Sequence, residues 1–332
     1  MVSVIIPTLN SGSHLAAGLK SLSVQDYAPI EIIVVVNKAG AVADLRQVFP
    51  GIIWIENKTN LGFAAANNQG AAAAEGEYLL FLNDDVEVEP DFLTKLMKRT
   101  EEEPAVGICQ SKILLMQDHT LLDTAGSFFT FCGFLQHLGH REKDLGQYDK
   151  LKEIFSPKGA CMLVRREAIQ KAGLFDEDFF AFFEETDLAW RVWLAGFRVE
   201  LVSDSRVYHK VGATATKLPS AFIDYHSFKN RICALIKNLE FKNLLLILPI
   251  HIFLCLGLGF LYLVSLRFSN AFSIIQAMLW NIFHLPGTLS KRNYVQKKIR
   301  LKSDAEIFAK TRVNFSPAYF SRFLSQYIKS RW

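Results

Sequence analysis

The sequence lacks the features that mark a disulfide scaffold, a zinc protein or a repeat protein. Its five cysteines are scattered, with no CxxC pair and no cluster of His and Cys. This usage excludes a disulfide framework and favours a reducing compartment. No internal repeat and no low-complexity linker occurs. The first ten residues, MVSVIIPTLN, have no positively charged segment and contain Pro7, so we expect a first strand there and no signal peptide.

Charge is scarce for a chain of this size, and apolar residues are abundant. Of the 332 residues, 21% are charged and 50% are hydrophobic. A composition of this kind excludes a largely disordered chain and can bury a substantial core. The length is typical of one large domain with an appendage, or of two domains.

The first hundred residues alternate between strand-like and helix-like segments. Helical spacing occurs at residues 13–25, 41–49 and 62–74, and β-rich runs occur at residues 2–8, 30–37, 52–57 and 77–83. This order predicts an α/β fold with a doubly wound, mostly parallel sheet and helices on both faces. Such sheets bind ligands at the carboxyl ends of their strands. Three strand ends carry polar residues: Pro7-Thr8-Leu9-Asn10, Asn37, and Asn83-Asp84-Asp85.

The stretch AFFEETDLAWR, residues 181–191, crowds three acids beside phenylalanines. Carboxylates next to apolar rings are costly to ionise, which raises their pKa toward the range of a general base. Asp187 and Arg191 are i, i+4 on the predicted helix, so we expect them to form an ion pair. Glu185 lies about 100° around the helix from Glu184 and can face a cleft. The alternative is an acid-rich helix N-terminus, which the helix dipole favours.

Hydropathy rises sharply after Lys242. Residues 244–266 carry no formal charge, and these 23 residues would form a helix about 34 Å long, enough to cross a bilayer core. The alternative is a buried core helix. A second apolar segment, residues 271–286, is too short for a simple span. Its polar side chains fall on one helical arc, so it is expected to be amphipathic; they are Ser273, Gln276, Asn281 and His284.

Basic residues flank both apolar segments on their outer sides. From Gly287 to Trp332 there are eleven Lys/Arg and two Asp/Glu, and residues 316–332 resemble a membrane-surface helix. By the positive-inside tendency both outer ends are cytoplasmic. A helical hairpin, a re-entrant pair or an interfacial layer keeps both ends on the cytoplasmic side, whereas a single membrane crossing would place the basic C-terminal end outside. We therefore expect membrane-associated C-terminal helices on the cytoplasmic face of the bacterial inner membrane.

Five motifs, in order, resemble the family 2 glycosyltransferases, in particular their rhamnosyltransferase-like branch. They are VSVIIPTLN, NLGFAAANNQG, LLFLNDDVEVEPDFL, the long segment from KGACMLVRREAI through EETDLAWRVWLAGFRV, and VYHKVGAT. The resemblance implies a GT-A (Rossmann-like) fold, a nucleotide-sugar donor, a divalent metal and inversion at the anomeric carbon. It covers residues 1–235, which we expect to form the catalytic domain. Residues up to about 105 would bind the nucleotide sugar, and residues 106–235 the acceptor, leaving 236–332 as a membrane-associated helical region with a basic amphipathic tail.

The resemblance also implies roles for individual residues. Asn83, Asp84 and Asp85 occupy the family's DXD position, where Asp85 matches the usual metal ligand and the other two lie beside the donor. For an isolated NDD the alternative is an ordinary polar turn. His209 matches a histidine that completes the metal site. Imidazole is a reasonable ligand for Mn²⁺ and an unusual one for Mg²⁺, so Mn²⁺ is favoured.

The remaining candidates follow from the same resemblance. Among the acids, Glu185 matches the general base, with Glu184 and Asp187 beside it as further catalytic candidates. Val36 replaces an Asp that contacts the base in the family, and a valine accepts no hydrogen bond, so Asn37 is expected to substitute through its amide oxygen. The other nucleotide-sugar candidates are Pro7, Thr8, Asn10, Asn60, Gly62 and Asn67. The acceptor candidates are Gly159, Ala160, Lys229 and Arg231, of which the last two are equally well explained as positive flanks of a membrane segment.

The implied function is transfer of a sugar to a lipid-linked saccharide acceptor in bacterial cell-surface polysaccharide synthesis. The resemblance alone suggests dTDP-rhamnose as donor. The alternatives are another donor such as a UDP-hexose, or a non-catalytic, membrane-bound protein that binds a nucleotide sugar. No nucleic acid partner is expected. A nucleotidyltransferase should carry a Gly-rich, basic loop after the first strand, and PTLNSGSHL is not such a loop.

Overall fold

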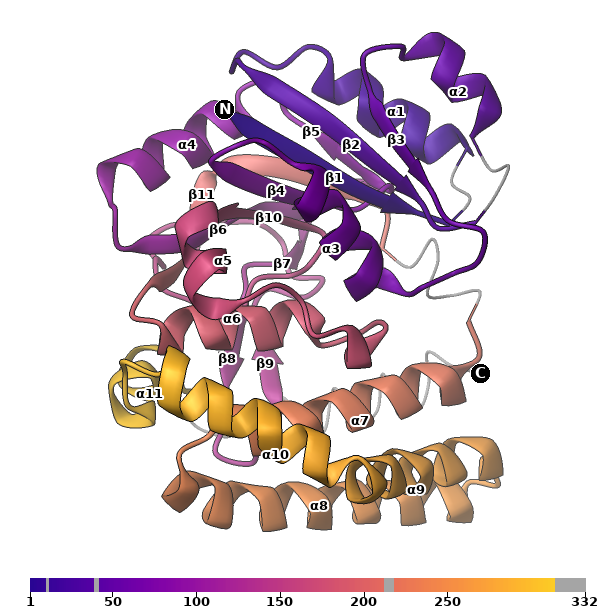
Figure 1. The fold of residues 1–332 in the computed structure, drawn as a ribbon, viewed down its shortest axis with the longest axis vertical. Helices are drawn as coiled ribbons and strands as arrows, with labels where there is room; N and C mark the ends of the chain where they lie inside the picture. The colour runs from indigo at the N-terminus through magenta and orange to yellow at the C-terminus, as the bar shows by residue number, and fades with distance from the viewer. Residues whose placement is uncertain (10–11, 39–41, 212–217, 314–332) are drawn as a thin grey trace.

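The computed structural model describes residues 1–9, 12–38, 42–211 and 218–313. Its centre is one nine-stranded sheet in the order β3-β2-β1-β4-β10-β6-β11-β5, with β7 paired to β6 (Figure 1). β8 and β9 form a separate two-stranded sheet. The strands are β1 Val2–Thr8, β2 Ile30–Val36, β3 Ile53–Glu56, β4 Tyr78–Leu82, β5 Val86–Val88, β6 Val106–Leu115, β7 Asp118–Thr124, β8 Ser127–Phe129, β9 Leu135–His137, β10 Cys161–Arg165 and β11 Arg198–His209.

The first four strands of the sheet run parallel to one another, as the alternating pattern predicts. β1 pairs in parallel with β2 and with β4, and β2 pairs in parallel with β3. β10 then runs antiparallel between β4 and β6, and β11 returns to a parallel pairing with β6. The predicted mostly parallel α/β sheet is confirmed. Because parallel strands end at one edge, Thr8, Val36 and Leu82 bring their following loops together.

Helices cover both faces of this sheet (Figure 1). Successive residues of a strand point to opposite faces, so Val4 of β1 packs with α1 and α4 on one face, whereas Ile5 packs with α3 on the other. The helices are α1 Gly12–Leu22, α2 Ala43–Val48, α3 Phe63–Ala73, α4 Phe92–Glu102, α5 Arg166–Ala172, α6 Glu184–Leu194, α7 Ser220–Asn238, α8 Phe241–Val264, α9 Phe268–Phe283, α10 Leu285–Tyr294 and α11 Asp304–Thr311, with short helical turns η1 Glu177–Phe179 and η3 Val295–Ile299.

The C-terminal helices form two groups with different surroundings. α8 and α9 lie at the bottom of the molecule, with α7 between them and the sheet (Figure 1). The chain after α10 returns to the main hydrophobic core, where Val295, Ile299 and Phe308 are buried and the ring of Phe308 stacks on Phe129 with centroids 4.7 Å apart. The exposed apolar surface of residues 236–313 therefore centres on α8 and α9, and η3 and α11 contribute to the main core.

α8 is not the buried core helix that the sequence left as an alternative. It is 24 residues long, its most apolar 18-residue window has a mean hydropathy of 2.6, and only 22% of that window is buried. It is the one helix among the described residues that is long and apolar enough to cross a membrane.

The polar side chains that were predicted to share one arc of the second apolar segment differ in burial. Ser273 and Asn281 are buried, whereas Gln276 and His284 are exposed. The predicted surface helix at residues 316–332 lies outside the described residues.

Candidate active site

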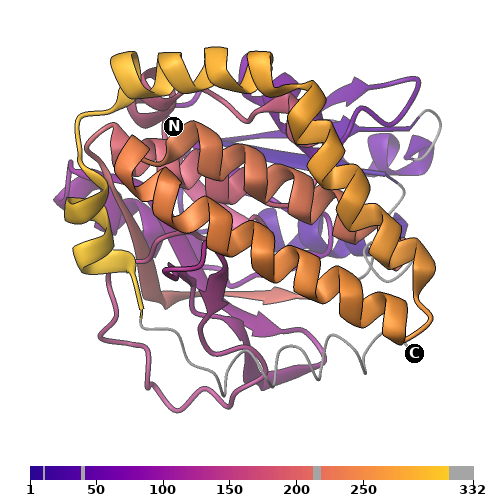
Figure 2. The same ribbon diagram turned by 90° about the horizontal axis from the view of Figure 1, so that it is seen from below.

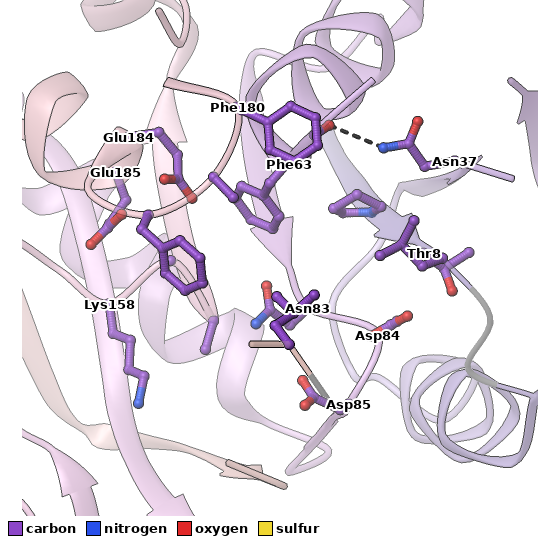
Figure 3. Close-up of a pocket in the computed structure, with 18 of the residues that line it drawn as sticks. Thr8, Asn37, Phe63, Asn83, Asp84, Asp85, Lys158, Phe180, Glu184 and Glu185 are labelled. Atoms are coloured by element: carbon purple, nitrogen blue, oxygen red, sulfur yellow. Dashed lines mark hydrogen bonds between the residues drawn. The ribbon is translucent and has the colours of Figure 1, made fainter. Parts of the chain in front are cut away.

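A pocket of about 430 Å³ opens at the carboxyl ends of β1, β2 and β4. It is the place where a parallel sheet is expected to bind its ligand. Figure 3 shows Asp84 and Asp85 on one side of it and Glu184 and Glu185 on the other. Thirteen residues predicted from the sequence line it: Pro7, Thr8, Asn37, Asn60, Gly62, Asn83, Asp84, Asp85, Gly159, Ala160, Glu184, Glu185 and His209.

The side chains of Asp85 and His209 lie close together at one side of the pocket, although the two residues are far apart in sequence. His209 is the last residue of β11 and pairs with Val86 of β5, directly after Asp85. Both side chains are buried, and His209 Nε2 lies 3.3 Å from Asp85 Oδ1. Two neighbouring ligands of an octahedral metal ion lie about 3 Å apart. The two predicted ligands are thus brought together at a separation that suits a shared divalent ion.

Asp123, which the sequence did not single out, fixes the orientation of His209. Its carboxylate lies 2.8 Å from His209 Nδ1 and also accepts two hydrogen bonds of 2.6 Å from Lys158. Burial alone would raise the pKa of Asp123, but the charges of Lys158 and His209 hold it well below its usual range. An imidazole that donates Nδ1–H to a carboxylate presents Nε2 as the free acceptor, the arrangement typical of metal-binding histidines.

Two buried oxygen atoms at this end of the pocket lack a hydrogen-bond partner among the described residues. They are Asp85 Oδ1 and Asn83 Oδ1. A buried oxygen without a partner costs about 1–3 kcal/mol, and a bound cation would remove that cost. The described residues hold no cluster of three or more His, Cys, Asp or Glu side chains that could bind a metal by themselves. The residues therefore fit a metal that takes two protein ligands and completes its shell from a ligand and water.

Glu184 and Glu185 begin α6 and face the pocket from the opposite side. Glu184 is buried, and Glu185 is only partly so. Burial raises the pKa of both carboxyl groups, and for Glu184 the charge of Glu185 adds to the rise and takes it well above the usual value. The Thr186 hydroxyl donates to Glu185 Oε1 at 3.2 Å, whereas Glu184 Oε2 has no partner among the described residues. Burial therefore opposes ionisation of both carboxyl groups, and the charge of Glu185 opposes that of Glu184 further.

Asp187 lies behind the pocket and does not line it. It is fully buried and forms the predicted ion pair with Arg191, at 2.9 Å. Lys237 and Asn238 of α7 also donate to it, at 2.9 and 2.8 Å. Burial opposes ionisation, but the charges of Lys237 and Arg191 hold the pKa of Asp187 below its usual value. Its position therefore fits an ion pair that attaches α6 to α7, and not contact with a substrate.

Asn37 holds the loop of residues 57–62, which forms one wall of the pocket, through four hydrogen bonds. Its Oδ1 accepts from the Leu61 backbone N–H at 3.0 Å and from Asn57 at 3.1 Å, and its Nδ2 donates to Asn60 and to the Gly62 carbonyl (Figure 3). A carbonyl oxygen has two lone pairs, and both are engaged here. The amide oxygen thus shapes residues 57–62 in place of contacting a nucleotide base, contrary to the sequence-based expectation.

A strained aromatic loop forms the adjoining wall. Phe180, Phe182 and Phe183 have φ of 58°, 68° and 72°, a left-handed conformation that costs about 1 kcal/mol or more per non-glycine residue. Asn230 of α7 donates from Nδ2 to the carbonyls of Phe179, Ala181 and Phe182, at 2.9, 2.9 and 2.6 Å. One buried amide of α7 therefore helps to hold the loop in this conformation.

The same loop fits against Gly62 at the start of α3. The Phe180 carbonyl accepts from the N–H groups of Phe63 and Ala64, at 2.6 and 3.2 Å. Gly62 has φ of +91°, and a Cβ on it would lie 2.6 Å from Phe180. A side chain at this position would both strain the backbone and displace the aromatic wall.

Besides Asp187, four predicted site residues do not line the pocket or cannot be placed. Asn67 is buried inside α3, where its Nδ2 donates to the Phe63 carbonyl at 2.9 Å. Lys229 is buried, donates to the Asp178 carbonyl and lies 4.6 Å from the Trp280 ring, and burial lowers its pKa to about 8. Arg231 lies over the rings of Phe134 and Phe183. Asn10 is outside the described residues.

Several residues that line the pocket or support its walls had little or no signal in the sequence. Lys158 directly precedes the predicted Gly159 and could have been found from its place in that motif. Asp123 lies 86 residues from His209, and Asn230 lies 48 to 51 residues from its partners, so no local pattern points to them. The rest of the wall is apolar: Leu9, Phe63, Phe180, Ala181, Phe182, Phe183, Val211, Leu218 and Phe222.

The fold and the pocket place the chain among α/β proteins that bind a ligand at the carboxyl ends of a mostly parallel sheet. The family model described as Glycosyl transferase family 2 matches residues 3–173, just over half of the chain, and the chain belongs to this family. The fold is GT-A: the structure of Staphylococcus aureus TarS residues 1–349 in complex with UDP-GlcNAc aligns with a TM-score of 0.59 at 17% identity, covering 100% of this chain and 92% of that one.

The mannosyltransferase PcManGT from Pyrobaculum calidifontis, solved in complex with GDP-Man and Mn²⁺, aligns with a TM-score of 0.54 at 16% identity, covering 100% of this chain and 88% of that one. Two curated relatives bear on function. The O-antigen biosynthesis protein RfbC of Myxococcus xanthus is 29% identical over 69% of this chain and 19% of its own length. The N-acetylglucosaminyl-diphospho-decaprenol L-rhamnosyltransferase of Mycobacterium tuberculosis is 24% identical over 68% of this chain and 81% of its own. The matches span 19–37% of the length of the first three curated relatives.

Proposed function

We propose that this protein is an inverting glycosyltransferase that moves a sugar from a nucleotide-diphosphate donor to a hydroxyl group of an acceptor. One observation carries the proposal. Asp85 and His209 approach each other at one side of the pocket, and Glu185 faces the pocket from the other side. Membership of Glycosyl transferase family 2 supports the reaction class.

A divalent metal held by Asp85 and His209 would neutralise the diphosphate as it leaves. Each other step belongs to the chain's own side chains. Glu185 accepts the proton of the acceptor hydroxyl as that oxygen forms its bond to the anomeric carbon, and the bond to the diphosphate oxygen breaks on the opposite face. The products are the glycoside, the protonated carboxyl and the nucleoside diphosphate. The raised pKa of Glu184 favours its neutral form, which adds no second negative charge beside the base.

The raised pKa of Glu185 suits this task. A general base is most effective when its pKa lies near the operating pH, and burial moves Glu185 in that direction. The phenylalanines of the aromatic loop and Phe222 line the pocket beside it. They exclude water from the reacting atoms, which limits hydrolysis of the donor.

For the donor we propose dTDP-rhamnose, on the strength of the rhamnosyltransferase relative. Other nucleotide sugars compete with it, since structural neighbours were solved with UDP-GlcNAc and with GDP-Man and Mn²⁺. For the acceptor we propose a lipid-linked saccharide, at the cytoplasmic face of a bacterial inner membrane, in cell-surface polysaccharide synthesis. The apolar helix α8 and the printed names of the two curated relatives support this setting.

A donor panel tests the proposal. The full chain is incubated with Mn²⁺ or Mg²⁺, with dTDP-rhamnose, UDP-hexoses or GDP-mannose, and with a bacterial lipid extract, and nucleoside diphosphate is measured. Release that needs metal, one donor and the lipid extract together is the expected result. Metal-dependent donor binding with no release from any donor would support the non-catalytic binding protein. No binding of any donor would overturn both.

A further inference from the structure

In the outer layer formed by α8 and α9, the distribution of polar and apolar side chains is the reverse of that in a soluble protein. Its exposed face is almost wholly apolar, while polar side chains point inward: Ser273, Asn281 and His251 are buried. The large exposed apolar residues of the two helices are Phe241, Leu245, Leu246, Ile250, Phe253, Leu254, Leu256, Phe260, Leu261, Leu263, Val264, Phe268, Phe272, Ile275, Leu279, Ile282 and Phe283. A contiguous apolar surface of this extent marks a membrane or protein contact.

The buried residues of α8 are spread along nearly its whole length. Ile247, His251, Cys255 and Tyr262 are all buried, spaced four, four and seven residues apart, so they form one stripe on the helix. At the middle of that stripe His251 Nδ1 lies 2.9 Å from the Cys132 carbonyl, in the β8–β9 connection of the catalytic domain. The axis of α8 therefore lies along the protein body, and the helix does not project away from it.

α9 is attached to the same body by polar contacts. Asn281 donates to the Lys229 carbonyl of α7 at 3.0 Å, and Asn270 donates to Asp224 of α7 at 2.6 Å. Seen from below, the C-terminal helices extend across that side of the molecule (Figure 2). Neither α8 nor α9 can turn perpendicular to this plane without breaking these contacts.

The charge around the layer is mostly positive. Residues 241–303 contain eight Lys/Arg and no Asp or Glu, and Lys242, Lys297 and Lys298 are exposed. Beside the exposed Phe241 lies a groove of about 390 Å³, lined by Arg292, Lys297 and Arg300 with Leu289, Asn293, Gln296 and Glu240. Cations that border an apolar face are complementary to the phosphate groups of anionic lipids. Two copies of this face would instead bring like charges together.

We propose that α8 and α9 lie flat in the headgroup and outer acyl region of an anionic lipid surface, so that the protein binds one leaflet and α8 does not cross it. This deepens, and rests on, the membrane location in the proposed function. On binding, acyl chains replace the water that contacts the apolar face, and the bordering cations bind the headgroups. α7 lies between this layer and the pocket, where it contributes Phe222 to the wall. The acceptor's lipid end therefore stays in the leaflet while its saccharide reaches Glu185.

Depth measurements distinguish a flat helix from a spanning one. Leu246, Phe253 and Phe260 are each exposed, share one face of α8 and lie about 10 Å apart along its axis. Single Cys variants at these positions in the full chain are labelled with an environment-sensitive fluorophore. The five native cysteines are all buried and react slowly. Leu145→Cys, on an exposed site of the catalytic domain, is the control. Quenching is compared between lipids spin-labelled at shallow and at deep acyl positions.

A flat α8 gives the same shallow depth at all three positions and no quenching at position 145. Vesicles of phosphatidylcholine with one third phosphatidylglycerol should bind the protein at least tenfold more tightly than phosphatidylcholine alone, and high salt should remove the difference. A depth that changes by about 10 Å from one position to the next would mean a span and would overturn the proposal. So would a stable dimer in solution that binds no vesicles, because a second copy would then cover the face. Metal-dependent donor binding, measured on the same variants without vesicles, reports on the proposed function independently.

Discussion

The pocket and the α8–α9 layer differ in which side chains they present: the pocket presents acids and a histidine, and the layer exposes apolar side chains. In the pocket, acids and imidazole lie at the end of an apolar sheet, and the buried oxygens Asp85 Oδ1, Asn83 Oδ1 and Glu184 Oε2 have no hydrogen-bond partner among the described residues. In the layer, amides and a histidine face the protein while phenylalanines and leucines face outward. The difference supports the proposal that the layer faces lipid while the pocket opens to water. α7 joins the two regions, since Asn230 holds the pocket loop and the Lys229 carbonyl accepts from α9.

The largest effect is expected at the metal site. Asp85→Ala removes one of two proposed ligands and should abolish metal-dependent donor binding, lowering turnover on the order of 10³-fold, because a metal contributes several kcal/mol to leaving-group stabilisation. Titration of donor by calorimetry with and without Mn²⁺ measures it. Asp118→Ala, an exposed acid elsewhere on the chain, is the matched control. Unchanged Mn²⁺-dependent binding in the Asp85 variant would exclude it as a ligand.

Asn230→Ala should break the connection between the two regions. Three carbonyls of the strained loop lose their donor, so the wall beside Glu185 shifts, and a misplacement of about 1 Å can lower kcat about 10²-fold. Unfolding free energy should fall by about 1–3 kcal/mol. Asn243→Ala, which removes one hydrogen bond from α8 to Asp304 of α11, is the control and should lose stability without a comparable loss of kcat. Equal kcat in both variants would contradict a positioning role.

Asp123→Ala tests how His209 is oriented. Loss of a carboxylate that orients a metal-binding histidine costs about 10–100-fold in metal affinity, and the Nδ1 contact of 2.8 Å is of that kind. Mn²⁺ affinity, read by electron paramagnetic resonance without donor turnover, measures it. An affinity equal to that of the native chain would show that His209 needs no such support.

The smallest effect is a gain in stability from Glu184→Gln. Burial and the neighbouring Glu185 raise the folded-state pKa of Glu184, so the folded state prefers the protonated acid. That preference stabilises the fold below the unfolded pKa and is lost as pH rises through the folded pKa. Glutamine carries no charge to bury, so the variant should match the native chain near pH 4 and exceed it by about 1 kcal/mol or more at pH 8. Denaturant unfolding at both pH values checks this.

The parallel half of the sheet follows from the sequence because its signals are local. Continuous β-branched runs such as residues 30–36 and helical spacing between them determine element type and connection. The candidate ligands and base were found because they lie within motifs of a known family. The long apolar helix α8, expected at residues 244–266, was also recognisable, from its hydropathy.

The features of the site that the sequence did not predict depend on contacts between segments that are distant in the chain. Asp123 reaches His209 across 86 residues, and the three positive φ values of the aromatic loop are imposed by α7 and α3. Asn37 was assigned to the nucleotide base, yet its lone pairs are taken by residues 57–61. No periodicity or local motif encodes such pairings, because they exist only once the chain has folded.

Single-turnover transfer by Glu185→Gln tests the central claim most directly. Glutamine keeps the size of the side chain but cannot accept the hydroxyl proton. With donor, Mn²⁺ and lipid acceptor saturating, the account predicts unchanged donor binding and a transfer rate lower by about 10²–10⁴-fold, while Glu184→Gln stays within a few-fold of the native chain. A Glu185→Gln variant that transfers sugar at the native rate would contradict the assignment of Glu185 as the base.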